Sequence, residues 1–188
     1  MAKKIVVLIR GYPGVGKTTF SVELAKQARM CLLCKDDVRD VAVELEKDER
    51  WHTEMSTNAM CYGVLWRMVE TQLMVGHSVV VESPLGREDL YRQGVVTAQE
   101  GGALPVVMHC VLNEEEWGRR LCERSHRQRT GHEEDHKPTD VNEIKAHYGM
   151  DSYEMKSTPV LEIDCMRPVS ELVPSAISWL ESLAKVYQ

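Results

Sequence analysis

The amino-acid sequence predicts an α/β fold in which helices flank a five-stranded parallel sheet. Five short runs of apolar and β-branched residues have the composition of strands that are buried on both faces. Longer segments with helical spacing of apolar residues separate these runs. Because strands and helices alternate along the chain, each helix can cross from one parallel strand to the next, which predicts three layers.

The first predicted strand is the uninterrupted apolar run Ile5–Ile9, and the helix Thr18–Ala28 follows it with Phe20, Leu24 and Ala28 on one face. The other predicted strands are Cys31–Cys34, Ser78–Val81, Pro105–Leu112 and Val160–Ile163. The other predicted helices are Thr57–Val75, Arg87–Gln99, Glu114–Cys122 and Ser170–Val186. Ligands of such sheets bind beyond the carboxyl ends of the strands, so the functional residues are expected there.

The composition is that of a soluble globular protein, and the length predicts a single domain over residues 1–188. Hydrophobic residues make up 43% and charged residues 28% of the chain, and the net charge is −6. This acidic balance argues against a surface that grips nucleic acid through many phosphates. The six cysteines lack the close spacing of a disulfide scaffold, and Cys31-Leu-Leu-Cys34 is expected to be strand packing rather than a zinc or redox motif.

The N-terminus has too few apolar residues for the core of a signal peptide or for a membrane span. No later apolar run reaches the length that a membrane span needs. We therefore expect a cytoplasmic protein without membrane contact.

A glycine-rich motif follows the first predicted strand: Gly11-Tyr-Pro-Gly-Val-Gly16-Lys17-Thr18. It matches the phosphate-binding loop G-x-x-x-x-G-K-[ST], and the flanking strand and helix are the context that this motif requires; a turn that matches by chance is the alternative. Loop amides and Lys17 are expected to hold a triphosphate, and the Thr18 hydroxyl to coordinate Mg²⁺. The predicted nucleotide-binding residues of the loop are Gly11, Pro13, Gly14, Val15, Gly16, Lys17, Thr18 and Thr19.

Two acids and an arginine follow the second predicted strand, at Asp36, Asp37 and Arg39. A carboxylate near the phosphate loop can accept the proton of an acceptor hydroxyl, and Arg39 can steady the acceptor or the transferred group. One of the two acids is expected to cap the next helix, which leaves the other free for catalysis. The third predicted strand ends at Glu82, which is expected to hold the magnesium shell or contact substrate, with capping as the alternative.

The polar segment Arg119–Lys137 contains five arginines and three histidines, and it predicts a lid over about 119–139. A solvated loop without a special role is the alternative. Arg120, Arg124 and Arg127 recur at helical spacing and can project from one face toward the phosphates, with Arg129 as a further donor. The histidines at 126, 132 and 136 are expected to belong to the lid rather than to bind metal.

Taken together, these residues resemble the P-loop kinases that include polynucleotide 5′-hydroxyl kinases, zeta-toxin-like kinases and chloramphenicol phosphotransferases. The resemblance spans nearly the whole chain and rests on Ile5–Thr19, Asp36–Arg39, Glu82-Ser83 and Glu123–Arg129. It implies the three-layer P-loop NTPase fold with an arginine-bearing lid. It also implies that the turn with Arg167 and Pro168, which follows Leu161–Asp164, lies near the adenine.

The resemblance implies ATP and Mg²⁺ as cofactors, Asp36 as general base and Arg39 as a clamp on the substrate side. The predicted catalytic residues are Lys17, Asp36, Arg39, Arg124 and Arg127. The predicted metal residues are Thr18 and Glu82. Four residues complete the predicted nucleotide site: Arg120, Arg124, Arg167 and Pro168.

The predicted function is transfer of the γ-phosphoryl group of Mg-ATP to a hydroxyl of a small molecule such as a nucleoside, sugar or nucleotide sugar. A polynucleotide 5′-hydroxyl kinase and a non-catalytic ATP-binding regulator are the alternatives. A GTPase is disfavoured because the chain has no N-K-x-D motif, and a remodelling ATPase because it is short and has Glu82-Ser83 after the third strand. Glu46–Tyr62, which holds Trp51, His52, Met55 and Met60, is expected to flank the acceptor pocket.

Overall fold

The computed structural model of the chain describes residues 4–46, 55–130, 138–150 and 153–187. The strands are β1 (Lys4–Arg10), β2 (Cys31–Cys34), β3 (Val79–Glu82), β4 (Ala103–Val111) and β5 (Val160–Asp164). The helices are α1 (Lys17–Ala28), α2 (Lys35–Glu46), α3 (Thr57–Met74), α4 (Glu88–Glu100), α5 (Glu114–Arg129), α6 (Val141–Tyr148) and α7 (Val169–Val186).

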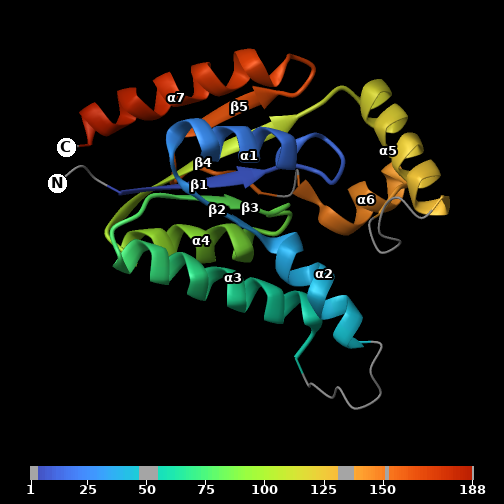
Figure 1. Cartoon of the computed structure of the whole chain (residues 1–188), viewed down its shortest axis with the longest axis horizontal. Coiled ribbons are helices and arrows are strands. Elements are labelled where there is room, and N and C mark those ends of the chain that lie inside the picture. The colour runs from blue at the N-terminus through green and yellow to red at the C-terminus, as the bar shows by residue number, and fades with distance from the viewer. Residues whose placement is uncertain (1–3, 47–54, 131–137, 151–152, 188) are drawn as a thin grey trace.

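The five strands form one parallel sheet in the order β2-β3-β1-β4-β5, which confirms the predicted fold class. The central strand β1 pairs with β3 on one side and β4 on the other, so that Val7 lies between Val80 and Val106. All five strands end at the same edge of the sheet, where the loop before α1 and the helices α2, α5 and α6 gather (Figure 1). Functional residues at the strand ends are therefore brought together.

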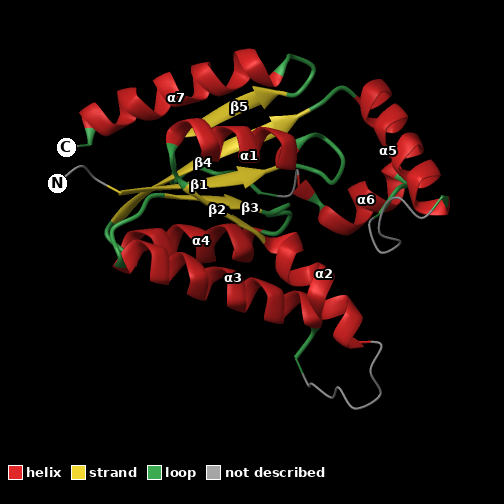
Figure 2. Cartoon of the chain, in the orientation of Figure 1, coloured by secondary structure: helices red, strands yellow, loops and turns green. Residues whose placement is uncertain are grey.

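Helices cover both faces of the sheet, with α1 and α7 on one side and α3 and α4 on the other (Figure 2). Side chains of β1 alternate between the faces, as the pleat of a strand requires. Val7 and Ile9 pack in the core that contains residues of α1 and α7, whereas Val6 and Leu8 pack in the core that contains residues of α3 and α4. This two-sided burial explains why the strand sequence is apolar without alternation.

Two described helices, α2 and α6, were not among the predicted elements. Their apolar signal is weak: Ala42 is the one buried apolar residue of α2, and Ile144 is the one buried residue of α6. Helix α2 begins directly after β2, where the sequence analysis expects Asp36 or Asp37 to cap the next helix but gives that helix no range. Both aspartates lie inside the first turn of α2, so neither precedes the helix as its cap, and residues 35–46 form part of the site's framework.

Helix α5 continues to Arg129, so the expectation that this helix ends at Cys122 was wrong. Polar contacts rather than apolar spacing support the added turns, because Arg119 pairs with Glu116 and Glu123 one turn away on either side. The Asn113 side chain caps the start of the helix by accepting a hydrogen bond from the amide of Glu116 at 2.8 Å. The first part of the predicted lid is thus helical, while residues 131–137 lie outside the described part of the chain.

Among the described residues, no helix combines the length and apolar character needed to cross a membrane.

Candidate functional site

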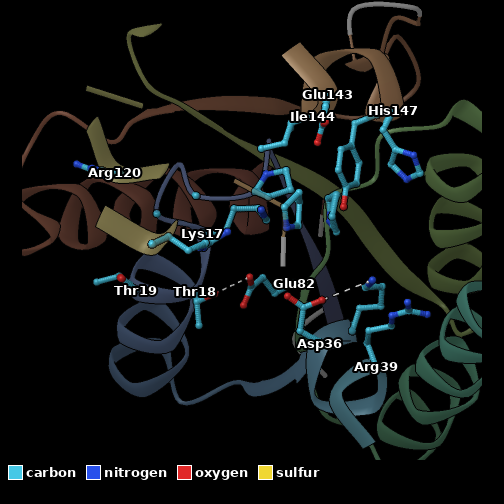
Figure 3. Close-up of a pocket in the computed structure, with 18 of the residues that line it drawn as sticks. Lys17, Thr18, Thr19, Asp36, Arg39, Glu82, Arg120, Glu143, Ile144 and His147 are labelled. Atoms are coloured by element: carbon cyan, nitrogen blue, oxygen red, sulfur yellow. Dashed lines mark hydrogen bonds and ion pairs between the residues drawn. The ribbon is translucent and has the colours of Figure 1, made fainter. Parts of the chain in front are cut away.

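A cavity of about 980 Å³ opens at the carboxyl ends of β2 and β3, and it is the place where the predicted site residues meet (Figure 3). Its walls come from the loop before α1 and from helices α1, α2, α3, α5 and α6. The wall formed by the loop and α1 is called here the phosphate wall. The opposite wall, formed by the starts of α2 and α3 and by α6, is called the acceptor wall.

The loop between β1 and α1 depends on its glycines for conformation and space. Gly14 and Gly16 have φ values of 86° and 117°, a region that other residues rarely adopt. A Cβ atom at Gly14 would lie 2.8 Å from Cδ2 of Leu121, so α5 packs directly on the loop backbone. These glycines give the loop the tight turn that exposes backbone amides to a phosphate.

Helix α5 also holds the loop through Trp117. The Trp117 indole donates a hydrogen bond from Nε1 to the carbonyl oxygen of Pro13 at 2.8 Å, and its ring stacks on Tyr12 at a centroid distance of 5.0 Å. Because Trp117 is itself buried, these contacts limit the movement of the loop. The phosphate wall is therefore preorganised before any ligand enters.

Lys17 lies at the start of α1, with only 7% of the residue exposed. Its Nζ donates a hydrogen bond to the carbonyl oxygen of Tyr12 at 3.0 Å. Burial lowers the pKa of Lys17, and the nearby Glu82 carboxylate partly opposes this shift. Glu82 offsets only part of the cost of burying this ammonium group. A bound phosphate would supply a further negative partner.

The two predicted metal residues are in direct contact across the sheet edge. Thr18 donates from Oγ1 to Oε1 of Glu82 at 2.8 Å (Figure 3). Ser21 donates from Oγ to the other carboxylate oxygen at 3.2 Å. Glu82 is 3% exposed, so the two hydroxyl groups fix a buried carboxylate beside the phosphate loop. A hydroxyl and a carboxylate are the hard oxygen donors that Mg²⁺ prefers, so these residues fit that ion. The role of Ser21 could not be read from the sequence motif.

The first turn of α2 distinguishes the two aspartates. Asp36 lines the cavity, whereas Asp37 is exposed and does not. Lys35, the first residue of α2, also lines the cavity and is buried, and its Nζ lies 3.5 Å from Oδ1 of Asp36. Arg39 completes this side of the acceptor wall. Of the two candidates for a general base, Asp36 has the required position.

Helix α5 carries the predicted arginines along the cavity. Arg124 and Arg127 both line it, as does Arg120. Arg120 donates from Nη1 to the carbonyl oxygen of Val15 at 3.0 Å and from Nη2 to that of Cys165 at 3.1 Å. It therefore links α5 to the phosphate loop and to the turn after β5. Arg129 is exposed and lies outside the cavity lining.

Glu116 orients two of these arginines. It accepts hydrogen bonds from Arg119 and Arg120, and these bonds lower the pKa of Glu116 to about 2. The carboxylate is therefore ionised at neutral pH and holds the Arg120 guanidinium in place for its contacts with the loop.

Four residues of the predicted nucleotide site are not part of the cavity lining. Gly11 and Val15 instead support the loop from behind: a Cβ at Gly11 would lie 2.6 Å from the carbonyl oxygen of Cys110, and Val15 is buried in the core. Arg167 pairs with Glu171 at 3.0 Å in the first turn of α7, directly after Pro168. Arg167 and Pro168 do not line the cavity, but the same turn approaches the loop, because a Cβ at Gly16 would lie 3.7 Å from Cβ of Cys165. Their place near the adenine stays a prediction.

The sequence did not reveal most of the acceptor wall. Asn58, in the first turn of α3, lines the cavity, and so do Glu143, His147 and Tyr148 of α6. Asn58 falls within the segment expected to flank the acceptor pocket, but Met55 and Met60 do not line the cavity, and Trp51 and His52 lie outside the described residues. The only available signal was position, because Lys35 is adjacent to Asp36 and α6 follows the predicted lid.

Cys31 and Cys34 are free thiols on β2, and both are only partly exposed. Burial raises the pKa of Cys34 to about 12. Within the described part of the chain, no group of three or more histidine, cysteine or acidic side chains is arranged to hold a metal ion.

The parallel sheet, the glycine-rich loop before α1 and the Thr18–Glu82 contact together define a P-loop protein with the kinase fold. A P-loop kinase family described as an AAA domain (AAA_33) matches residues 6–150, and the chain belongs to this family. Membership implies nucleotide binding. No protein of curated function matches the chain in sequence.

Solved structures with this fold cover nearly all of the chain. A putative kinase from Chloroflexus aurantiacus has a TM-score of 0.69 at 20% identity, with 97% of this chain and 98% of that chain covered. A sugar kinase from a Janibacter species has a TM-score of 0.68 at 14% identity, with 95% of each chain covered. An APS kinase from Mycobacterium tuberculosis, in complex with AMPPNP and APS, has a TM-score of 0.65 at 15% identity, with 96% and 99% covered. At these identities the likeness shows the shared fold.

Proposed function

We propose that the protein is a kinase that transfers the γ-phosphoryl group of Mg-ATP to a hydroxyl group of a small molecule. The observation that carries this proposal is the position of Asp36, which faces the same cavity as Lys17 and the arginines of α5. A protein that only binds nucleotide has no need of a carboxylate opposite the phosphate wall. In this proposal residues 1–188 form one kinase domain that acts in the cytoplasm, with a lid over about 119–139.

The phosphate wall holds the nucleotide. Backbone amides of the loop and the Lys17 ammonium group bind the phosphates, and Arg120 keeps the loop in position through Val15. Thr18 and Glu82 would hold Mg²⁺, which when bound neutralises charge on the phosphate oxygens. Arg124 and Arg127 supply further positive charge beside the transferred group.

The acceptor wall activates and orients the second substrate. Asp36 accepts the proton of the acceptor hydroxyl, and Arg39 steadies the acceptor. The hydroxyl oxygen forms a bond to the γ-phosphorus while the bond between that phosphorus and the β–γ bridging oxygen breaks. The electron pair of the broken bond leaves with ADP, so the products are a phosphate ester and ADP.

A small-molecule acceptor is favoured over a polynucleotide. The cavity is bounded on the acceptor side by α2, α3 and α6, and the chain carries a net charge of −6. Two solved structures with the same fold are a sugar kinase and an APS kinase in complex with AMPPNP and APS. A 5′-hydroxyl kinase that grips only a few nucleotides is the second candidate, because the arginines of α5 could bind their phosphates.

The test is transfer of label from γ-labelled ATP, with Mg²⁺, to two sets of acceptors. One set contains nucleosides, sugars, sugar acids and nucleotide sugars, and the other contains 5′-hydroxyl DNA and RNA oligonucleotides. Asp36→Asn should lower transfer by about 10²-fold, whereas Asp37→Asn, the same change at the next residue, should not, because Asp37 does not line the cavity.

Label on a small acceptor that depends on Asp36 would support the proposal, and label on oligonucleotides alone would favour the second candidate. Tight ATP binding with no transfer to either set would instead favour a non-catalytic regulator.

A further inference from the structure

Lys35 is a buried cation at the cavity that the proposed roles leave unexplained. Its side chain is 9% exposed, yet the residue lines the cavity together with Asp36 and Arg39. Burying an ammonium group is unfavourable unless a negative partner offsets the lost hydration. The partners of Lys35 therefore indicate what the site is built to bind.

The contacts of Lys35 within the protein leave its N–H donors without hydrogen-bond acceptors among the described residues. Its Nζ lies 3.5 Å from Oδ1 of Asp36, which is longer than an ordinary charge-assisted hydrogen bond, and 5.8 Å from the centre of the Tyr62 ring. Among the described residues, no hydrogen-bond acceptor is within bonding distance of its three N–H donors. Asp36 itself has a half-exposed side chain and is shared with the proposed chemistry.

Arg39 also has N–H donors that no described residue uses. It lies four residues after Lys35 on α2, so both side chains project from one side of the helix toward the cavity. With the described residues Arg39 makes no hydrogen bond or ion pair, although its guanidinium group has five donors. Two cations with unused donors thus lie side by side with the proposed general base.

The charge of the cavity is opposite to that of the chain. Its described lining has seven lysines and arginines against four carboxylates, although the chain carries a net charge of −6. The excess comes from Lys17 and the arginines of α5, because on the acceptor wall Lys35 and Arg39 are matched by two carboxylates, Asp36 and Glu143. With the described residues, neither Lys35 nor Arg39 makes a hydrogen bond, so their N–H donors remain available to an anionic ligand.

We infer that the acceptor carries an anionic group in addition to its hydroxyl, and that Lys35 and Arg39 bind this group. The inference rests on the proposed kinase function and narrows its substrate class. A carboxylate or phosphate held by these two residues places a neighbouring hydroxyl beside Asp36, because Lys35 and Asp36 are adjacent in the chain and in contact. Sugar acids and nucleoside monophosphates both have this chemistry, whereas free sugars and nucleosides lack it.

The first experiment measures binding with the phosphate wall filled by Mg-AMPPNP. Gluconate is compared with glucose, adenosine 3′-monophosphate with adenosine, and inorganic sulfate serves as the smallest anion. At least one anionic probe should bind, and Lys35→Met should weaken it by about 10- to 100-fold, as expected for a hydrogen bond between charged groups. Lys35→Arg should retain most of the affinity because it keeps the charge.

Lys26→Met is the matched control, because Lys26 is exposed on α1. This substitution removes the same charge at a position away from the cavity. It should leave the binding of every probe unchanged. If no anionic probe binds in a manner that depends on Lys35, the inference is wrong. Unaltered binding of AMPPNP to Lys35→Met would show that this variant is folded.

The second experiment separates a binding role of Lys35 from an effect on Asp36. With an anionic acceptor, Lys35→Met should raise KM and change kcat much less, and it should lower kcat/KM for anionic acceptors far more than for neutral ones. A lower kcat for neutral and anionic acceptors alike would mean that Lys35 only tunes Asp36, which would overturn the inference.

The two proposals can fail separately. Equal transfer to neutral and anionic acceptors, without dependence on Lys35, would refute the anionic substrate class and keep the kinase. Binding of anions that depends on Lys35, without any transfer that depends on Asp36, would keep the anion site and refute the kinase.

Discussion

The phosphate wall and the acceptor wall face each other across one cavity but are built differently. On the phosphate wall, Lys17 and Thr18 each make a hydrogen bond to the loop backbone or to a buried side chain, and Arg120 of α5 bonds to the loop at Val15. On the acceptor wall, Lys35 and Asp36 share one contact of 3.5 Å. The first wall is arranged in advance for a ligand that all P-loop proteins share, whereas the second keeps its donors for a ligand that differs between them.

The two walls also differ in how they are anchored. Helix α1 of the phosphate wall buries Phe20 and Leu24 against the sheet. Helix α6 of the acceptor wall buries Ile144 alone. Elements with few buried apolar contacts open locally at lower free energy than the core. Helix α3 of the same wall is held in the core by Leu65 and Trp66, so we expect α6, rather than the whole acceptor wall, to adjust to the ligand.

The largest effect is expected at the phosphate wall. Lys17→Met should lower kcat for phosphoryl transfer by about 10³-fold. The substitution removes a positive charge that is positioned to stabilise the negative charge developing on the phosphates in the transition state. Steady-state transfer assays measure this change. Lys26→Met, an exposed lysine on the same helix, is the control and should keep full activity. An unchanged kcat in Lys17→Met would place the phosphates elsewhere.

A smaller but selective effect is expected at the acceptor wall. Asp36→Asn should lower kcat by about 10²-fold, near the lower range for general bases, because the phosphoryl transition state is loose. The Kd for ATP should stay the same, since Asp36 acts on the acceptor, and nucleotide titration measures it. A large loss of ATP affinity would mean that the two walls are not separate, and Asp37→Asn controls for the change of charge.

Substitution of Glu82 tests whether its carboxylate helps to bind Mg²⁺. Glu82→Gln keeps an acceptor for the Thr18 hydroxyl but removes the negative charge, so the Mg²⁺ concentration for half-maximal activity should rise by roughly tenfold. A magnesium titration of activity checks this expectation. Glu23→Gln, on the exposed side of α1, should not alter the magnesium requirement.

Preorganisation of the phosphate loop can be weakened without touching the ligand. Trp117→Phe keeps an aromatic ring beside Tyr12 but removes the hydrogen bond to the carbonyl oxygen of Pro13. Loss of about 1 kcal/mol corresponds to roughly fivefold weaker ATP binding. Trp179→Phe, in a partly buried helix position on α7, should leave the Kd for ATP unchanged. Equal binding by Trp117→Phe would mean that the loop is held by its glycines and α1 alone.

The smallest effect concerns pH and the arginines of α5. Arg119 and Arg120 lower the pKa of Glu116 to about 2 from 4.5, so its ionised form stabilises the folded state. This contribution should be fully present above pH 4.5 and should be lost as the pH falls toward 2. The difference in free energy of unfolding between the wild type and Glu116→Gln, measured by urea denaturation, should shrink over that range. A difference that stays constant would show that Glu116 titrates normally.

Part of the site could be predicted because its residues lie close together in the sequence. The loop from Gly11 to Thr18 has a fixed spacing, and the apolar runs on either side define β1 and α1. Helices α2 and α6 were not predicted in this way, because each buries only one apolar residue. The extended α5 was missed for a related reason, since its two buried residues, Trp117 and Leu121, both precede Cys122.

The sequence by itself determined the parallel α/β fold, the phosphate loop and the candidate carboxylates, because strand and helix periods and turn glycines act locally. Only the tertiary structure decided that Asp36 rather than Asp37 faces the cavity, that Ser21 joins Thr18 on Glu82, and that Lys35 is buried beside the proposed base. The physical reason is that these contacts depend on how α1, α2 and β3 pack. Packing brings together side chains that are far apart along the chain, and no local pattern records which of their polar atoms remain unsatisfied.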